Sequence, residues 1–290
     1  MDTEWTIKKA VDWGREYLDN AGIDNAGYDS YELFSNVYPV TRTELLVHGD
    51  REVAASYMDR YIEDIHKRAE HIPLQHITGK AYFYGNEFVV NENVLIPRQD
   101  TEVLIEELLK VTDSESRVID MCTGSGCILL TLASLKHVSE DLNGCVGVDI
   151  SDKALEVAKM NADRLNVPFA RFVESNLFEK LDKEIYNGYD VIVSNPPYIR
   201  SDVIPTLSLE VKEHDPMLAL DGHEDGLFFY RIITKASSEY LKRGGYLLYE
   251  IGYDQGEDVS ALMKQNGFCD VKVVKDLAGL DRVVMGHLPE

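Results

Sequence analysis

The sequence lacks the features on which several classes of protein depend. Its four cysteines, Cys122, Cys127, Cys145 and Cys269, form no Cys-x-x-Cys pair, and no spacing of cysteine and histidine is typical of zinc binding. We therefore expect no metal, and reduced thiols in a cytoplasmic protein. No apolar run approaches the roughly 20 residues that cross a bilayer. The N-terminus has no apolar stretch of the signal-peptide kind, so we expect no membrane partner.

Basic residues are also scarce. Lys and Arg number 29 against 51 Asp and Glu, which gives 290 residues a formal net charge of -22. Nucleic-acid binding depends on Lys and Arg that displace phosphate counterions, so this charge opposes non-specific contact with DNA or RNA. The hydrophobic content of 44% is that of an ordinary globular protein. The length suffices for one large domain and one small domain.

The first part of the chain has helical periodicity. Apolar residues recur at steps of three and four over 7–18, and "TRTE" at 41–44 matches a capping box. The segment 51–69 places its apolar and aromatic residues on one helical stripe, which predicts a buried face, and Pro73 ends it. We predict an N-terminal helical domain over 1–74.

The periodicity changes after this region. "AYFYGNEFVVNENVLI", residues 81–96, has short β-favouring runs broken by Gly85-Asn86, which predicts a β-hairpin linker within 75–96. "PRQDTEVLIEELL" follows, and its Asp100 is a candidate cap for a helix that begins just after it.

The remaining residues, 97–290, alternate strands with helices. The alternation predicts an α/β domain, with a mostly parallel sheet covered on both faces. Its last two strands lack a helix between them, so they are expected to pair as an antiparallel hairpin at the edge. The expected strands are 117–121, 145–150, 170–175, 189–195, 246–251, 270–276 and 281–286, and the expected helices are 128–136, 151–166 (capped by Ser151), 227–241 and 259–268.

The segment "DMCTGSGC" contains a glycine-rich turn between a strand and a helix. Gly124 and Gly126 permit a tight turn and a close backbone approach to a ligand. Asp149 ends the next strand, where it is placed to accept hydrogen bonds from ribose hydroxyls. The combination predicts a nucleoside site. The glycine turn and Asp149 together do not separate NAD from S-adenosylmethionine, although the spacing of the glycines is not GxGxxG and so disfavours NAD.

The segment "VIVSNPPYI" ends the fourth strand in unusual chemistry. Asn195 lies at the carboxyl end, where α/β sheets bind ligands. Pro196 and Pro197 leave their carbonyls free and stiffen the loop, and Tyr198 adds an aromatic wall. Asn195 and a proline carbonyl would accept both N–H bonds of a flat amide or amino group. Beside a methyl sulfonium they would favour the pyramidal nitrogen of the transition state. The alternative is a rigid turn that ends the strand, and the motif alone does not separate an amide from adenine.

Together these segments resemble the class I S-adenosylmethionine-dependent methyltransferases that carry an NPPY motif. The closer resemblance is to the release-factor glutamine methyltransferases, the PrmC/HemK family, through "PRQDTE", "DMCTGSGCI", "SNPPYI", "EHDPMLALDGHEDG", "YEIGYDQG" and "DLAGLDRVVMG". The resemblance implies a Rossmann-like domain over 97–290, and helices and a hairpin before it that help to hold a protein substrate.

The resemblance also implies an activity. The methyl acceptor would be the glutamine of the Gly-Gly-Gln motif of peptide chain release factors, and the products N5-methylglutamine and S-adenosylhomocysteine. The implied cofactor-binding residues are Cys122, Thr123, Gly124, Ser125, Gly126, Asp149, Asn176, Leu177 and Asn195, with Arg98 and Thr101 near the mouth of the site. The implied substrate-binding residues are Asn195, Pro196, Pro197 and Tyr198, of which Asn195, Pro196 and Tyr198 are catalytic.

Three positions depart from the family pattern, and several alternatives stay open. Gln99 replaces a proline, Cys122 a glycine, and Asn176 an acidic residue that would contact the adenine. The alternatives are a glutamine methyltransferase acting on a ribosomal protein, an adenine-N6 nucleic-acid methyltransferase and a catalytically silent adaptor. We expect a monomer with no direct nucleic-acid partner. The carboxylates of Glu210, Glu213, Asp215 and Asp221 are candidates to face a basic substrate.

Overall fold

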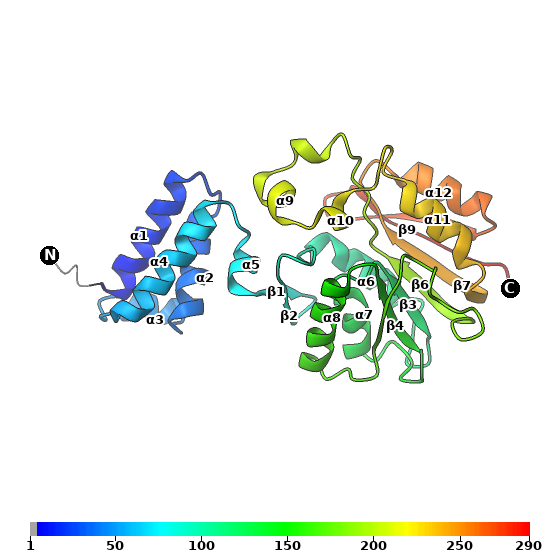
Figure 1. Cartoon of the computed structure of the whole chain (residues 1–290), viewed down its shortest axis with the longest axis horizontal. Helices are drawn as coiled ribbons and strands as arrows, with labels where there is room; N and C mark the ends of the chain where they lie inside the picture. Colours follow the sequence, from blue (N-terminus) through cyan, green and yellow to red (C-terminus); the bar gives the residue numbers. More distant parts are fainter. Residues whose placement is uncertain (1–4) are drawn as a thin grey trace. The chain divides into compact units, whose positions relative to one another are not determined.

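The computed structural model describes residues 5–290 and divides the chain into two compact units. The first unit runs up to Lys80 and also contains the distant segment Ser208–His214. The second unit consists of Ala81–Leu207 and Asp215–Glu290. Figure 1 labels the elements of both units.

The first unit is helical. Its elements are α1 (Ile7–Asn20), α2 (Ala26–Val37), α3 (Arg42–Val47), α4 (Ala55–Ala69), α5 (Leu74–Thr78) and, from the distant segment, α9 (Leu209–His214). The expected capping box is confirmed, because the Thr41 side chain accepts from the Glu44 backbone N–H while the Glu44 carboxylate accepts from that of Thr41. Helix α2 is not among the elements expected from the sequence, and Pro73 not only follows α4 but also caps α5.

The helices pack tightly around one aromatic residue. Tyr61 is fully buried, and its hydroxyl lies 2.8 Å from the Ser30 hydroxyl, which donates to the carbonyl of Val11 at 2.7 Å. Gly14 of α1 packs against Tyr61. A Cβ at Gly14 would overlap the Tyr61 hydroxyl, so only glycine leaves room for the tyrosine. The expectation that the aromatic residues of the segment 51–69 belong to the core is confirmed for Tyr61. It is wrong for Tyr57, which stays 41% exposed.

A buried cation holds α9 in the helical unit. Arg68 of α4 is 5% exposed. Its Nε donates to Asp29 of α2 at 2.6 Å, and its Nη2 forms an ion pair with Glu210 of α9. A buried guanidinium requires such compensation, so α9 supplies one of the two carboxylates that make this core stable.

The second unit contains the expected seven-stranded sheet, in the order β5-β4-β3-β6-β7-β9-β8 (Figure 1). The pairs from β5 to β7 are parallel, and β9 pairs antiparallel with both β7 and β8, which confirms the predicted edge hairpin. The strands are β3 (Val118–Met121), β4 (Cys145–Asp149), β5 (Arg171–Glu174), β6 (Tyr189–Ser194), β7 (Leu241–Glu250), β8 (Cys269–Lys275) and β9 (Asp281–His287). The predicted small hairpin is also present, as β1 (Lys80–Phe83) and β2 (Asn86–Val89).

Helices cover both faces of the large sheet. Successive residues of a strand point to opposite faces, so Val118 packs with α6, α7 and α8, whereas Ile119 packs with α11 and α12. The helical elements of this unit are η1 (Gln99–Thr101), α6 (Glu102–Leu108), α7 (Cys127–Ser134), α8 (Asp152–Arg164), η2 (Ile204–Thr206), α10 (Met217–Leu220), α11 (Phe228–Ser237) and α12 (Gly256–Gln265). The Ser151 side chain caps α8 as predicted, accepting from the Ala154 N–H at 3.2 Å.

Several sequence predictions about the ends and caps of elements are wrong, including the helix expected over 259–268, which is α12 at Gly256–Gln265. The helix expected over 227–241 ends at Ser237, and β7 begins at Leu241 instead of 246, because Leu241 already pairs with Tyr189 before a register shift. Asp100 does not cap α6. A 3-10 turn precedes that helix, and the Asp100 carboxylate instead lies 3.2 Å from the guanidinium of Arg282.

Within residues 5–290, no helix has the length and apolar character needed to cross a membrane.

Candidate active site

A cavity of about 320 Å³ opens where β3, β4 and β6 end. Strand β4, the next strand in the chain, lies beside β3 in the sheet, and β6 lies on the opposite side of β3. The carboxyl edge at such a switch point is where open α/β sheets bind ligands. The volume is at the lower end of the roughly 300–1,000 Å³ typical of small-molecule sites.

The turn after β3 forms the floor of the cavity. The Thr123 hydroxyl donates to buried Asp120 at 2.6 Å, and the Gly124 N–H donates to the Asp149 carboxylate at 2.9 Å. Gly124 has a φ of +54°, and a Cβ there would meet no protein atom within 4 Å. A side chain at this position would therefore extend into the cavity, which is the reason for a glycine.

Asp149 ends β4 and lines the same cavity. Each of its carboxylate oxygens accepts one backbone N–H, from Gly124 and from Ser151, both at 2.9 Å. Burial raises the pKa of Asp149, and these backbone hydrogen bonds oppose the rise. A carboxylate has about four acceptor positions, so Asp149 retains capacity for two further donors such as ribose hydroxyls. The residues present therefore fit a nucleoside cofactor.

Cys122 occupies a strained position in this turn. Its φ of +63° lies in the left-handed region, which costs a non-glycine residue roughly 1–2 kcal/mol. This backbone conformation explains why glycine is usual at that point in the family it resembles. Burial raises the pKa of the Cys122 thiol, and raises that of the neighbouring Cys127 to about 12, so both remain protonated at neutral pH.

Asn176 and Leu177 follow β5 and border the cavity. The Asn176 side-chain N–H donates to Glu179 at 2.7 Å, which turns the amide nitrogen away and leaves its oxygen as the available group. Leu177 has a φ of +49°, a second strained residue at the rim.

The acceptor end of the cavity begins at β6. The Ser194 hydroxyl donates to the Met121 carbonyl at 2.5 Å and ties the end of β6 to β3. Asn195 and Pro197 line the cavity. No hydrogen bond from any residue within 5–290 reaches the Asn195 side-chain oxygen or the Pro196 carbonyl, and of these two residues Asn195 lines the cavity.

Three residues of the expected site lie behind the cavity lining. Gly126 packs under the turn, where a Cβ would approach Leu130 to 3.0 Å. Pro196 is buried, and Tyr198 is partly buried against the core. The Tyr198 hydroxyl donates to Glu250 at 3.4 Å, and burial raises the pKa of this phenol, which keeps it neutral.

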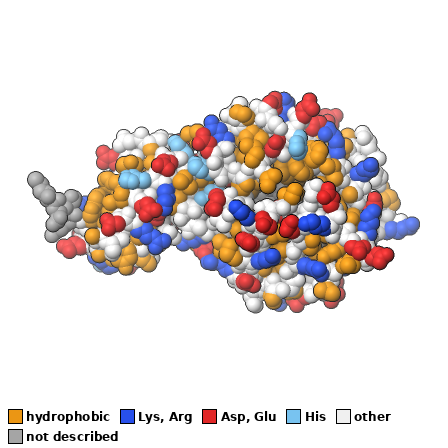
Figure 2. All heavy atoms as spheres, viewed as in Figure 1, with side chains coloured by type: hydrophobic (Ala, Val, Ile, Leu, Met, Phe, Trp, Pro, Cys, Tyr) orange, Lys and Arg blue, Asp and Glu red, His pale blue; other side chains and the backbone are white. Residues whose placement is uncertain are grey.

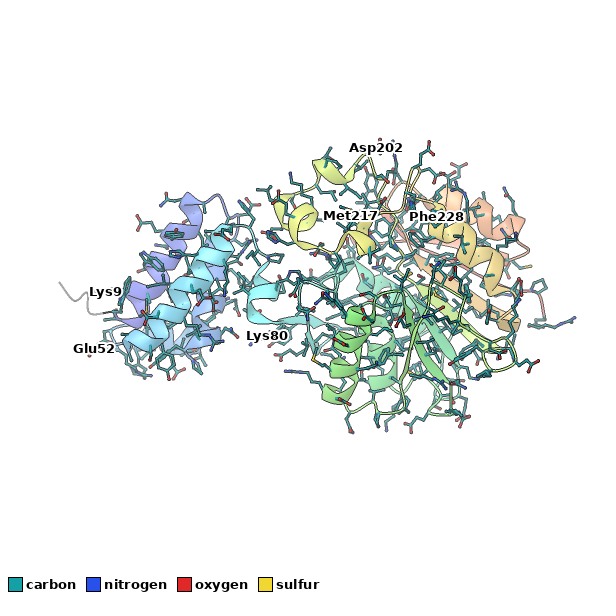
Figure 3. All side chains as sticks on the ribbon, in the orientation of Figure 1. Lys9, Glu52, Lys80, Asp202, Met217 and Phe228 are labelled. Atoms are coloured by element: carbon teal, nitrogen blue, oxygen red, sulfur yellow. The ribbon has the colours of Figure 1, made fainter. Side chains whose placement is uncertain are left out.

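Much of the cavity wall was not expected from the sequence. Figure 3 labels Met217 on α10 and Phe228 at the start of α11, the two helices that flank the segment 221–227. The unexpected lining residues include Asn93, Val94, Leu95, Pro97, Cys127, Pro216, Leu218, Ala219, His223, Phe228 and Phe229. Arg98 and Thr101 do line the cavity, and Arg98 donates to Asp215 at 2.6 Å.

The acidic residues after the NPPY motif have partners inside their own units. Glu210 pairs with Arg68, and Asp215 pairs with Arg98. Asp221 accepts from the Ser201 hydroxyl at 2.6 Å and from the His223 N–H at 2.9 Å. Of the four candidates to face a basic substrate, these three are therefore engaged, whereas Glu213 is exposed. In the part of the chain that the structure describes, no group of three His, Cys, Asp or Glu side chains is arranged to hold a metal.

The molecular surface bears on the nucleic-acid alternative. On the face shown in Figure 2, Lys and Arg side chains alternate with Asp and Glu and form no continuous basic stripe among the described residues. A protein that binds nucleic acid through its phosphates usually presents such a stripe.

Comparison with known proteins agrees with this arrangement. A family model described as the methyltransferase small domain matches residues 98–209, and one described as the PrmC N-terminal domain matches residues 9–79. A methyltransferase from Pyrococcus furiosus shares the fold, with a TM-score of 0.52 and 13% identity over 72% of this chain and 91% of its own. Fold and site together define a methyltransferase of the Rossmann-like class.

Relatives that match most of this chain identify its family within the class of methyltransferases. The release factor glutamine methyltransferase of Geobacter sulfurreducens is 41% identical over 98% of this chain and 97% of its own length. That of Fusobacterium nucleatum is 41% identical over 93% of this chain and 75% of its own. The chain belongs to the family of release factor glutamine methyltransferases.

Proposed function

We propose that this protein transfers a methyl group from S-adenosylmethionine to the side-chain amide nitrogen, N5, of the glutamine in the Gly-Gly-Gln motif of peptide chain release factors. The observation that carries the proposal is one cavity lined by both Asp149 and Asn195, whose side-chain oxygen accepts no hydrogen bond from residues 5–290. Membership of the family supports the choice of a glutamine amide over adenine.

The cofactor end of the cavity would hold S-adenosylmethionine through residues of the β3 and β4 turns. Asp149 would accept hydrogen bonds from the ribose hydroxyls, and the segment from Cys122 to Ser125 would line the methionine part. Asn176 and Leu177 would border the adenine, with the Asn176 oxygen accepting from its amino group. The bound cofactor supplies a methyl group on a positively charged sulfur, so its transfer needs no metal.

The acceptor end would bind and orient the glutamine. An amide nitrogen is a poor nucleophile because its lone pair is delocalised into the carbonyl. The Asn195 oxygen and the Pro196 carbonyl would each accept one of its N–H bonds and stabilise the pyramidal nitrogen that forms during transfer. Pro197 would border the amide. Tyr198, which lies partly behind the lining, would fix the loop rather than stack squarely on the substrate.

The substrate and setting follow from the same proposal. The helical domain of 1–74 and the hairpin linker of 75–96 would help to hold the release factor, and 97–290 would carry the chemistry. The protein would act as a monomer in the cytoplasm, without direct contact to nucleic acid, consistent with its charge of -22.

The test is a competition between acceptors. The protein is incubated with methyl-labelled S-adenosylmethionine, purified release factor, ribosomal protein and duplex DNA, and the label is mapped by mass spectrometry. The expected result is one methyl group on the Gly-Gly-Gln glutamine. Label on the ribosomal protein or on adenine, with none on that glutamine, would overturn the proposal in favour of the corresponding alternative.

A further inference from the structure

Tyr198 of the NPPY motif is held at both its ends by two buried residues from the segment "YEIGYDQG". We propose that these two, Glu250 and Gln255, are positioning residues of the acceptor site. They fix Tyr198 and thereby the positions of the Asn195 side-chain oxygen and the Pro196 carbonyl. The inference rests on the proposed function for its consequence in turnover, whereas the contacts themselves belong to the fold.

Gln255 holds the Tyr198 backbone. It is 8% exposed, and its side-chain Nε2 donates to the carbonyls of Tyr198 at 3.1 Å and of Gly226 at 3.2 Å. Its Oε1 accepts from the Gly252 N–H at 2.9 Å and from the Tyr230 hydroxyl at 3.5 Å. With both ends of the amide engaged, its orientation is fixed, and the Tyr198 carbonyl has one defined place.

The segment "DGHEDG" confines Tyr198 from another side. A Cβ at Gly222 would lie 2.7 Å from Tyr198 backbone carbons, and one at Gly226 only 2.4 Å from the Tyr198 carbonyl oxygen. Distances under 3.0 Å are not sustained by real side chains, so both positions require glycine. This loop is therefore a close-packed support for the NPPY turn.

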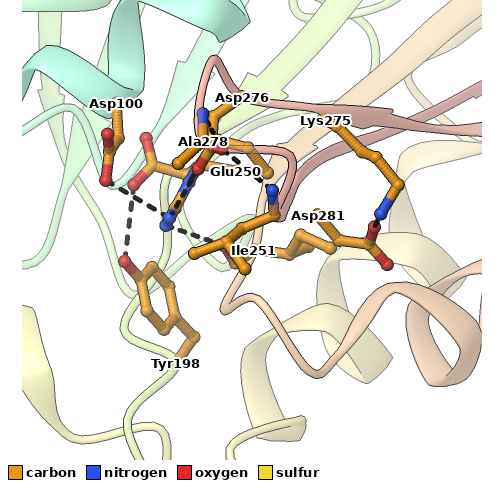
Figure 4. A network of polar contacts seen from close by, with 10 residues as sticks. Asp100, Tyr198, Glu250, Ile251, Lys275, Asp276, Ala278 and Asp281 are labelled. Carbon is orange, nitrogen blue, oxygen red and sulfur yellow. Dashed lines mark hydrogen bonds and ion pairs between the residues drawn. The ribbon is translucent and has the colours of Figure 1, made fainter.

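Glu250 holds the other end of Tyr198. It ends β7, is 2% exposed and accepts from the Tyr198 hydroxyl at 3.4 Å. Burial raises the pKa of Glu250 to about 7, and the Thr101 side chain and the buried guanidinium of Arg282 oppose this rise. Asp100 and Asp276 pair with Arg282 at 3.2 and 3.1 Å (Figure 4). A buried carboxylate needs this compensation. The network joins the segments "PRQDTE", "SNPPYI", "YEIGYDQG" and "DLAGLDR".

The chain between Tyr198 and Asn195 transmits the restraint. It consists of Pro196 and Pro197, whose rings fix φ near −65°, so few backbone torsions separate the anchored tyrosine from the two acceptors. Acceptors of a reacting group must be held within about 0.5 Å of their productive position. An anchor behind a stiff turn achieves this without contact to the substrate.

The first test replaces Gln255 with methionine, which keeps the length of the side chain and removes its hydrogen bonds. The matched control is Gln265→Met, at the exposed last residue of helix α12, the helix that Gln255 precedes. We expect kcat with release factor to fall about tenfold to 100-fold in Gln255→Met, the scale of a small misplacement of reacting groups. The dissociation constant for S-adenosylmethionine should stay unchanged. Equal activity of the two variants would overturn the proposal.

The second test asks whether Glu250 acts through the Tyr198 hydroxyl. Glu250→Leu should lower kcat by up to about tenfold, the loss of roughly one hydrogen bond, while Glu250→Gln, which keeps an acceptor oxygen, should restore most of it. In a Tyr198→Phe background, Glu250→Leu should have little further effect. Full additivity of the two losses would contradict the proposal.

A readout independent of activity separates this proposal from the proposed function. With 3-fluorotyrosine at position 198, the fluorine resonance should shift and broaden in Gln255→Met and in Glu250→Leu but not in Gln265→Met. If the wild-type protein does not methylate release factor, the proposed function fails while this result still tests the anchoring. An unchanged resonance in all variants means that Tyr198 is held by other groups, and the inference is wrong.

Discussion

The two ends of the cavity are built differently. At the cofactor end, Asp149 already accepts two backbone N–H groups, one from Gly124 in the turn after β3 and one from Ser151 just after β4. At the acceptor end, the Asn195 oxygen and the Pro196 carbonyl have no donor among residues 5–290, and the support comes from behind, through Gln255, more than fifty residues further along the chain.

The difference teaches how each end keeps its shape. The cofactor end is rigid because its polar groups bind one another, so it can be ready before a ligand arrives. The acceptor end keeps its polar groups available for the ligand, so its rigidity has to come from prolines and from groups that the ligand never contacts. Removing a residue from one end should therefore leave the other end working.

Asn195→Ala is the substitution expected to have the largest effect on the acceptor end alone. It removes one acceptor from the reacting nitrogen and nothing from the cofactor end. Loss of one preorganised hydrogen-bonding group costs about 100- to 1,000-fold in kcat in comparable sites, and we expect a loss of that size with unchanged binding of S-adenosylmethionine. Single-turnover assays and calorimetry measure the two quantities. Equal loss of both would make Asn195 a cofactor-binding or structural residue.

Asp149→Ala is the converse substitution, which affects the cofactor end alone. Hydrogen bonds to a charged group contribute about 1.5–3 kcal/mol, so we expect the dissociation constant of S-adenosylmethionine to rise about tenfold to 100-fold. At saturating cofactor, kcat should recover to near the wild-type value, because the acceptor end is intact. Titration calorimetry and assays at increasing cofactor concentration give both numbers, and a kcat that stays low at saturation contradicts the separation of the two ends.

A glycine-to-alanine pair sharpens the comparison through stability. Gly226→Ala places a Cβ 2.4 Å from the Tyr198 carbonyl at a φ of +73°, whereas Gly124→Ala meets no protein atom at a φ of +54°. Strain and overpacking together should cost Gly226→Ala about 2–4 kcal/mol. Gly124→Ala should lose only about 1–2 kcal/mol, but its Cβ should weaken cofactor binding. Urea unfolding of both variants tests the order, which the reverse ranking would refute.

A pH-dependent effect concerns the carboxyl group beneath the cofactor turn. Burial raises the pKa of Asp120 from 3.8 to about 7, so between these values the folded protein binds a proton that the unfolded chain has released. The free energy of unfolding contributed by Asp120 therefore decreases as pH rises through this range, by up to roughly 1.4 kcal/mol per pH unit. In Asp120→Asn this slope should disappear.

Urea unfolding at pH 5, 6, 7 and 8 measures it. The stability of Asp120→Asn relative to wild type should increase with pH and level off above about 7. Glu250 has a pKa raised by burial to about 7 as well, but it is present in both proteins and cancels in the difference. A difference that does not change with pH would mean that Asp120 is ionised when folded.

The same contrast explains what the sequence predicted. The cofactor end comes from contiguous motifs, so Gly124 and Asp149 are recognisable by their place after strands, and Asn195 by its place at a strand end. Tyr198 and its anchors are different, because Glu250 and Gln255 become partners of the NPPY turn only through the packing of the sheet. Nothing local marks them, and the same holds for the wall formed by Phe228 and Phe229. The local sequence predicts a helix cap at Asp100 because its actual partner, Arg282, lies far away in sequence.

The position of α9 has a practical consequence for anyone who dissects this protein. The polypeptide passes between the two units after Lys80, after Leu207 and after His214. A fragment that ends at Lys80 would keep Arg68 but lose Glu210, leaving the buried guanidinium with the Asp29 carboxylate and the Ile72 carbonyl. The complementary fragment would carry six helical residues that are too short to fold by themselves. The molecule is thus two folding units but not two separable pieces, and expression of either half calls for a graft or excision of Ser208–His214.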